Sequence, residues 1–158
     1  MKRNQRGAKR RRRQIRVWTL EQTRAALPYL SSVVRSLREH RLEAVAQHRS
    51  AARLAHRPGR PDRDTLIAHA EAVKAAEQAD ERFRETLAEL EALDIFLTDP
   101  VAGQALIPFA HDENLAWYVY DAFDPEPVRF WRYHSDPLET RRPLAEIAGN
   151  EQERTWLA

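Results

Sequence analysis

Apolar residues recur at helical spacing through the first half of the chain. After Thr19, which can form a capping box with Gln22, they fall mostly three or four residues apart. This first series consists of Leu27, Leu30, Val34, Leu37, Val45, Ala52 and Ala55. The spacing predicts a helix over residues 19–57, in which Pro28 either introduces a kink or separates a short lead-in from the longer part.

A second helical series follows a break at residues 57–62 that contains two prolines and a glycine. Asp62 or Asp64 can cap the helix that begins there. The series alternates steps of three and four residues, as in a coiled coil, at Leu66, His69, Val73, Ala76, Asp80, Phe83, Leu87 and Leu90. We therefore expect a second helix over residues 62–93, antiparallel to the first.

Large and small side chains are distributed unevenly along this expected hairpin. Leu37, Phe83, Leu87 and Leu90 meet at its base, far from the turn, whereas alanines dominate near the turn. Residues 20–60 carry a net charge of +5 and residues 62–99 a net charge of −7, so we expect the helices to attract each other. Exposed ion pairs contribute about 0.2–1 kcal/mol each, so the apolar residues determine the stability.

The pattern then changes to alternation with a period of two. Residues 105–109, 115–120 and 128–133 read as strands, and residues 121–127 as the turn-rich connector between the last two. These segments predict a three-stranded antiparallel meander, which a short segment at residues 95–97 can join. One face should cover the base of the hairpin. Residues 144–157 predict a short closing helix docked by Trp156, and the fold class is α+β.

Charge separates the N-terminus from the rest of the chain. Of the 158 residues, 26 are Lys or Arg and 24 are Asp or Glu; residues 1–16 hold nine of the basic residues and no acid, which leaves −7 on the remainder. We expect residues 1–16 to be a disordered tail and residues 17–158 to be a single domain.

The basic tail has two interpretations. It can bind the phosphates of nucleic acid through Lys9, Arg10, Arg11, Arg12, Arg13 and Arg16, without reading the sequence of bases. Alternatively, it reflects a general preference for Arg, because 23 of the 26 basic residues are Arg.

Several classes of site and location are excluded or disfavoured. The chain has no Cys, which excludes disulfides, thiolate metal sites and a Cys nucleophile. It has no apolar stretch near 20 residues and no secretory signal pattern, which indicates a cytoplasmic protein without a membrane partner. His40 and Glu43 share a helix face, but Asp80 is the single acid near the seam, so we expect no metal and no cofactor.

One group of residues in the second half is suited to ligand binding. It comprises Arg129, Trp131, Arg132, Tyr133, His134, Arg141 and Arg142. Alternation along the strand predicts that Arg129, Trp131 and Tyr133 share a cationic and aromatic face, suited to an acidic peptide or a phosphate. Alternatively, the aromatic rings pack on the hairpin and the arginines pair with the acidic second helix.

The order of motifs resembles an uncharacterised bacterial family, domain of unknown function 2203. The opening, from Thr19 to Pro28, is similar to that family's start, and residues 99–103 and 115–117 are similar to its middle. Trp131-Arg132, followed by residues 141–144, resembles its ending. Arg132 stands where the family has His. The resemblance implies no activity.

The leading hypothesis for function is a non-catalytic interaction protein that binds a protein partner or a second copy of itself through the hairpin. The alternative is a nucleic-acid or ribosome-associated factor that uses the basic tail. A third hypothesis is an enzyme that uses the Arg, Tyr and His cluster, although the chain lacks the local signatures of hydrolases and phosphate loops.

Overall fold

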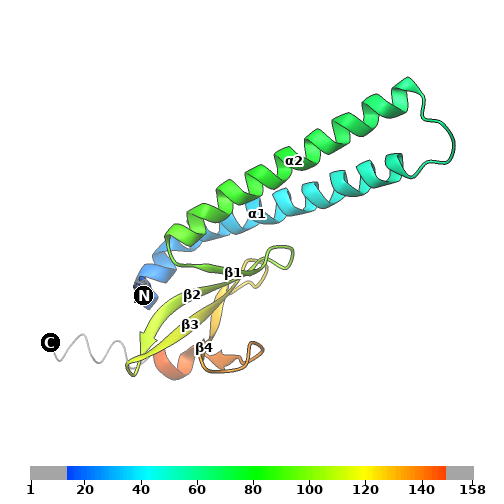
Figure 1. Ribbon diagram of the computed structural model, residues 1–158. Coiled ribbons are helices and arrows are strands. Elements are labelled where there is room, and N and C mark those ends of the chain that lie inside the picture. The colour runs from blue at the N-terminus through cyan, green and yellow to red at the C-terminus, as the bar shows by residue number, and fades with distance from the viewer. Residues whose placement is uncertain (1–13, 149–158) are drawn as a thin grey trace, which may run out of the picture.

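The structure, a computed structural model, describes residues 14–148 and consists of a long helical hairpin packed on a sheet (Figure 1). Helix α1 spans Leu20–Ala55 and helix α2 spans Arg63–Ala92. The α+β class and the antiparallel hairpin predicted from the sequence are confirmed. No helix among the described residues is both long enough and apolar enough to cross a membrane.

The sheet is antiparallel throughout and contains five strands rather than the three of the predicted meander. In spatial order these are β1 (Phe96–Asp99), β2 (Gln104–His111), β3 (Asn114–Asp121), β4 (Val128–Tyr133) and β5 (Arg142–Pro143). The short segment near residues 95–97 becomes β1. Strand β5 was not predicted, because a strand of two residues is too short to show an alternation of apolar and polar positions. Residues 145–148 are helical and fall within the closing helix expected at residues 144–157, while Trp156 lies outside the described residues.

The helix starts follow the capping signals in the sequence. The Thr19 side chain accepts a hydrogen bond from the Gln22 backbone at 3.1 Å, and the Gln22 side chain accepts one from the Thr19 backbone at 3.1 Å. Asp62 caps α2 by accepting a hydrogen bond from the Thr65 backbone at 2.8 Å. Helix α1 continues through Pro28 without interruption, so Pro28 does not divide it.

The base of the hairpin and one face of the sheet form a single core. Leu37 and Leu90 are fully buried there, together with Phe83. The face of the sheet that meets them, here called the inner face, contributes Ile107, Phe109, Tyr118, Tyr120 and Trp131. Figure 1 shows the sheet beneath the half of the hairpin remote from the turn, which confirms that the sheet covers the base.

The helical seam is shifted from the predicted register by one residue at several positions. The residues buried along α1 include Leu30, Leu37, Ala44 and Ala51, seven apart, and those along α2 include Ala72, Ala76, Ala79, Phe83 and Leu90. Val45, Ala52 and Leu66, which the sequence assigned to the seam, are exposed. Small side chains allow close approach of the helices, so alanines rather than the larger residues beside them occupy the seam.

Two polar residues occupy the intervening seam positions of α1. The Arg41 guanidinium lies over the Phe83 ring, 4.1 Å from its centroid. The Nε2 atom of His48 lies 2.7 Å from the Oδ2 atom of Asp80. These contacts explain why the apolar pattern is weak around Arg41 and His48.

Candidate functional site

The structure divides the seven-residue cluster between the two faces of the sheet. Trp131 pairs with Tyr118 of β3 on the inner face, and Arg132 pairs with Trp117 and faces the opposite, outer side. A β-bulge beside Tyr120 interrupts the alternation near Arg129. The prediction of one shared face therefore holds for Trp131 and Tyr133 and is wrong for Arg129.

The aromatic residues of β4 pack at the inner face. Trp131 is buried, and its ring centroid lies 4.9 Å from that of Tyr133 and 5.0 Å from that of His111, both in edge-on arrangements. The Arg142 guanidinium lies 5.5 Å from the Trp131 ring centroid and 5.1 Å from the Tyr133 centroid. Trp131 therefore belongs to the core that the inner face shares with the base of the hairpin, and its ring contacts are with residues of the sheet.

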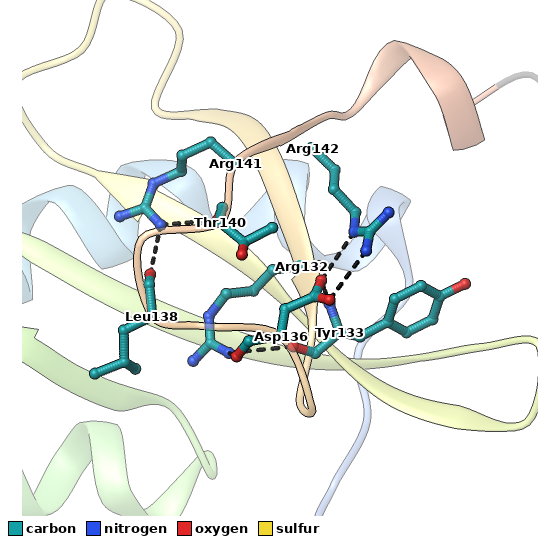
Figure 2. Close-up of polar contacts among 7 residues, drawn as sticks. All are labelled: Arg132, Tyr133, Asp136, Leu138, Thr140, Arg141 and Arg142. Carbon is teal, nitrogen blue, oxygen red and sulfur yellow. Dashed lines mark hydrogen bonds and ion pairs between the residues drawn. The ribbon is translucent and has the colours of Figure 1, made fainter.

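Asp136 lies in the loop that joins β4 to β5. Its carboxylate accepts two hydrogen bonds from Arg142, at 2.8 and 2.9 Å, and one from the Tyr133 backbone at 2.9 Å. The hydrogen bonds from Arg142, and secondarily the bond from Tyr133, lower the pKa of Asp136 from 3.8 to about 2. The same pairing raises the pKa of Arg142. This bidentate pair fixes the loop that connects the two strands (Figure 2).

The expected pairing of these arginines with α2 is wrong. Arg129 bonds Asp124 at 2.7 Å, and Arg142 bonds Asp136 at 2.8 Å, so both acids come from loops of the sheet. Each acid lies only five or six residues from its arginine in the sequence. Pairing with an acid so near in the sequence closes only a short loop, which costs less chain entropy than pairing with an acid on a distant helix.

Arg132 and Arg141 gather on the outer face. Arg132 is 4% exposed, and its Nη1 donates hydrogen bonds to the carbonyls of Tyr133, at 3.1 Å, and Asp136, at 3.3 Å. Arg141 donates to the carbonyls of Leu138, at 2.8 Å, and Thr140, at 2.9 Å. Figure 2 shows both guanidinium groups on the side of the loop where Leu138 lies, with Arg142 on the other side.

These two arginines line a cavity of about 250 Å³ on the outer face. Its remaining lining includes Asp99 and Gln104, which were not predicted as site residues because no motif of known chemistry marks them. His134 is directed elsewhere: its Nδ1 accepts a hydrogen bond from the Trp117 indole at 3.1 Å. The structure therefore brings together Arg132 and Arg141 as a candidate site, without His134.

Most of the predicted nucleic-acid site, Lys9 to Arg13, lies outside the described residues. Arg16 lies within them: its backbone N–H donates to Asp94 at 2.8 Å, and its guanidinium lies 5.0 Å from the Trp18 ring centroid. Arg16 thus contacts the folded part of the chain. Nucleic-acid binding by the tail stays a prediction. Within residues 14–148, no three His, Asp or Glu side chains gather as metal ligands.

A family model described as "Uncharacterized conserved protein (DUF2203)" matches residues 16–144. The chain belongs to this family. The match spans both helices and reaches β5, and it confirms the resemblance inferred from the sequence. The description of the family names no activity. No curated protein and no solved structure matches the chain.

Proposed function

We propose that this member of the DUF2203 family is a non-catalytic interaction protein whose helical hairpin binds a second copy of the chain. The observation that carries the proposal is the exposure of apolar side chains on both helices away from the sheet. Leu42 and Val45 on α1, and Leu66 and Ile67 on α2, are between 38 and 56% exposed. Apolar residues clustered on a helical arm favour association with another helical surface.

The charges of the two helices also favour a second copy. The opposite net charges of residues 20–60 and 62–99 are little used within the hairpin: among the described residues, His48–Asp80 is the single ion pair that joins α1 to α2. Arg49 on α1 and Glu71 on α2 are exposed. A basic helix in one copy and an acidic helix in the other are complementary.

A two-fold arrangement uses both features. The contact of His48 with Asp80 sets the two helices level at that point, and a rise of about 1.5 Å per residue then places the patch at Leu42 and Val45 roughly 25 Å along the arm from the patch at Leu66 and Ile67. In an antiparallel pair of hairpins, α1 of each copy lies beside α2 of its partner, so the contact between the two types of patch forms twice in the dimer. The same pairing places basic α1 beside acidic α2.

The experiment measures molar mass by light scattering over a wide concentration range. The parent chain should form a dimer that weakens as salt rises, and Leu66→Glu should shift it to monomer. Val17→Glu, an equally large change at an exposed position near the base, should leave the dimer intact. A parent chain that stays monomeric throughout the range would refute the proposal.

Charge reversal tests the arrangement itself. Arg49→Glu and Glu71→Arg should each weaken the homodimer, because each places like charges on facing helices. An equimolar mixture of the two variants should restore a dimer, since the acidic α1 of one then meets the basic α2 of the other. Failure of the mixture to associate would exclude this pairing of α1 with α2.

A further inference from the structure

The cavity on the outer face of the sheet has charged walls and an apolar floor. Leu106 of β2 and Val119 of β3 form the floor, and the loop with Leu138, Glu139 and Arg141 borders it. Because the strand order is β1-β2-β3-β4, Asp99 at the end of β1 and Arg132 on β4 lie on opposite sides of this floor. The cavity therefore has an acidic end and a basic end.

Arg132 supplies the basic end with unused hydrogen-bonding capacity. Its Nη1 bonds two backbone carbonyls, and its Nε is buried without a partner and out of reach of the cavity, so Nη2, which bonds none of the described residues, is the atom that can meet a ligand. The nearby Asp136 carboxylate is taken up by the bidentate pair with Arg142, and Arg132 makes no ion pair among the described residues. A buried guanidinium without a carboxylate partner is costly, which favours a bound oxyanion beside it.

Arg141 adds a second guanidinium to the same end. Its Nη1 is held by the carbonyls of Leu138 and Thr140, so the group is fixed at the border of the cavity by its own loop. A carboxylate between two arginines receives charge-assisted hydrogen bonds from both.

Asp99 is positioned at the other end by its own turn. Its Oδ1 accepts hydrogen bonds from the backbone N–H groups of Val101, at 3.0 Å, and Ala102, at 2.9 Å. Thr98 and Gln104 line the cavity beside it, and Glu139 brings the charged lining to two cations and two anions. The charged lining is therefore neutral overall, which suits a ligand that carries one charge of each sign.

We propose that this cavity binds a small linear zwitterion, with a carboxylate at Arg132 and Arg141, an ammonium group at Asp99 and a short methylene chain over Leu106 and Val119. An ω-amino acid has this chemistry. The volume of about 250 Å³ suits a molecule of few heavy atoms, since pockets for drug-sized ligands begin near 300 Å³. No residue of α1 or α2 lines the cavity, so the proposal does not rest on self-association of the hairpin.

The test is calorimetric titration of the full chain at low salt with four probes: 6-aminohexanoate, glycine, hexanoate and hexylamine. We expect 6-aminohexanoate to bind at least about tenfold more tightly than the other three, because it alone places both charges at the two ends of the cavity. Equal binding of hexanoate would show a simple anion site and overturn the proposal. Absence of any 6-aminohexanoate binding up to about 10 mM would also overturn the proposal, because an affinity weaker than that does not fit a preformed site.

Variants locate the binding. Arg141→Gln and Asp99→Asn change surface residues and should each lower the affinity for 6-aminohexanoate at least about tenfold, the loss expected for one charged contact. Arg132→Gln should do the same, but it alters a buried group, so its thermal midpoint is measured alongside. The matched control is Arg129→Gln, an exposed arginine of the same sheet that is paired with Asp124. Unchanged affinity in both surface variants would contradict the assignment.

Discussion

The base and the tip of the hairpin are built from the same two helices and differ in what surrounds them. At the base, Leu37, Phe83 and Leu90 join the inner face of the sheet in one core. At the tip, the buried residues are alanines, outside that core, and the turn borders a groove of about 430 Å³. Figure 1 shows the tip projecting away from the sheet.

This difference assigns separate roles to the two regions. Apolar burial stabilises a fold roughly in proportion to the area removed from water, and large side chains at the base bury far more area than alanines do. At the tip, the alanines let the backbones of the two helices approach closely, and Val45, Leu66 and Ile67 stay exposed. The base therefore accounts for most of the stability, and the arm offers the surface for association.

The largest effect is expected from truncation at the base. Phe83→Ala removes a buried ring and the support for Arg41, and should lower the free energy of unfolding by about 3–5 kcal/mol, measured by urea denaturation. Ala75→Ser, toward the tip, should change it by less than about 0.5 kcal/mol. Similar small losses at both positions would remove the distinction between base and tip.

A smaller effect is expected from enlarging the alanine seam. Ala76 is 1% exposed, so Ala76→Leu must push the helices apart and should cost about 1–3 kcal/mol in the same assay. Ala70→Leu makes the same change at an exposed position of α2 and serves as the control. An Ala76→Leu variant as stable as the control would mean that the tip is loosely packed.

The loop between β4 and β5 should also respond to acid. The pKa of Asp136 is about 2 in the folded protein, compared with about 3.9 for an unfolded Asp, so its pairing with Arg142 stabilises the fold above about pH 4. This contribution should disappear progressively as the pH falls from about 4 to about 2.

Asp136→Asn should remove that part of the pH dependence, measured as the thermal midpoint across this range. Glu126→Gln, which alters an exposed carboxylate of a neighbouring loop, should keep the parental profile. An Asp136→Asn variant with the parental acid response would show that the pair with Arg142 adds no stability.

The sequence predicted the elements better than their exact contacts. Local signals predicted the helix caps at Thr19 and Asp62, and the structure contains both. They also predicted the burial of Leu37 and Leu90, which the structure confirms. The seam near the tip was assigned one residue off, because Val45 and Ala44 both fit helical spacing and only close packing selects the smaller one. Periodicity carries no information on that choice.

The candidate site was predicted in part. Arg132 and Arg141 were selected for their charge, but alternation along β4 could not reveal the β-bulge that separates Arg129 from Trp131. Asp99 was missed because its place opposite Arg132 depends on strand order across the whole sheet. Such long-range placement has no local sequence signature.

The smallest effect on stability is expected from the tail. Deleting residues 1–13 keeps Arg16, which contacts Asp94 and Trp18, and should leave the thermal midpoint unchanged. The same deletion should abolish salt-sensitive binding of mixed-sequence RNA, measured by fluorescence anisotropy, because the remaining residues 14–158 carry a net charge of −6. Retained affinity would transfer the binding to the arginines of the sheet.

Amide hydrogen exchange at low and high protein concentration tests the division between base and tip most directly. At low concentration, amides of residues 30–37 and of β3 should exchange only through global unfolding, and those of residues 51–55 and 65–72 through local opening. At high concentration, the amides near the tip should become protected while those at the base stay unchanged. Equal protection of tip and base at the lowest concentration, with no response to concentration, would contradict the account.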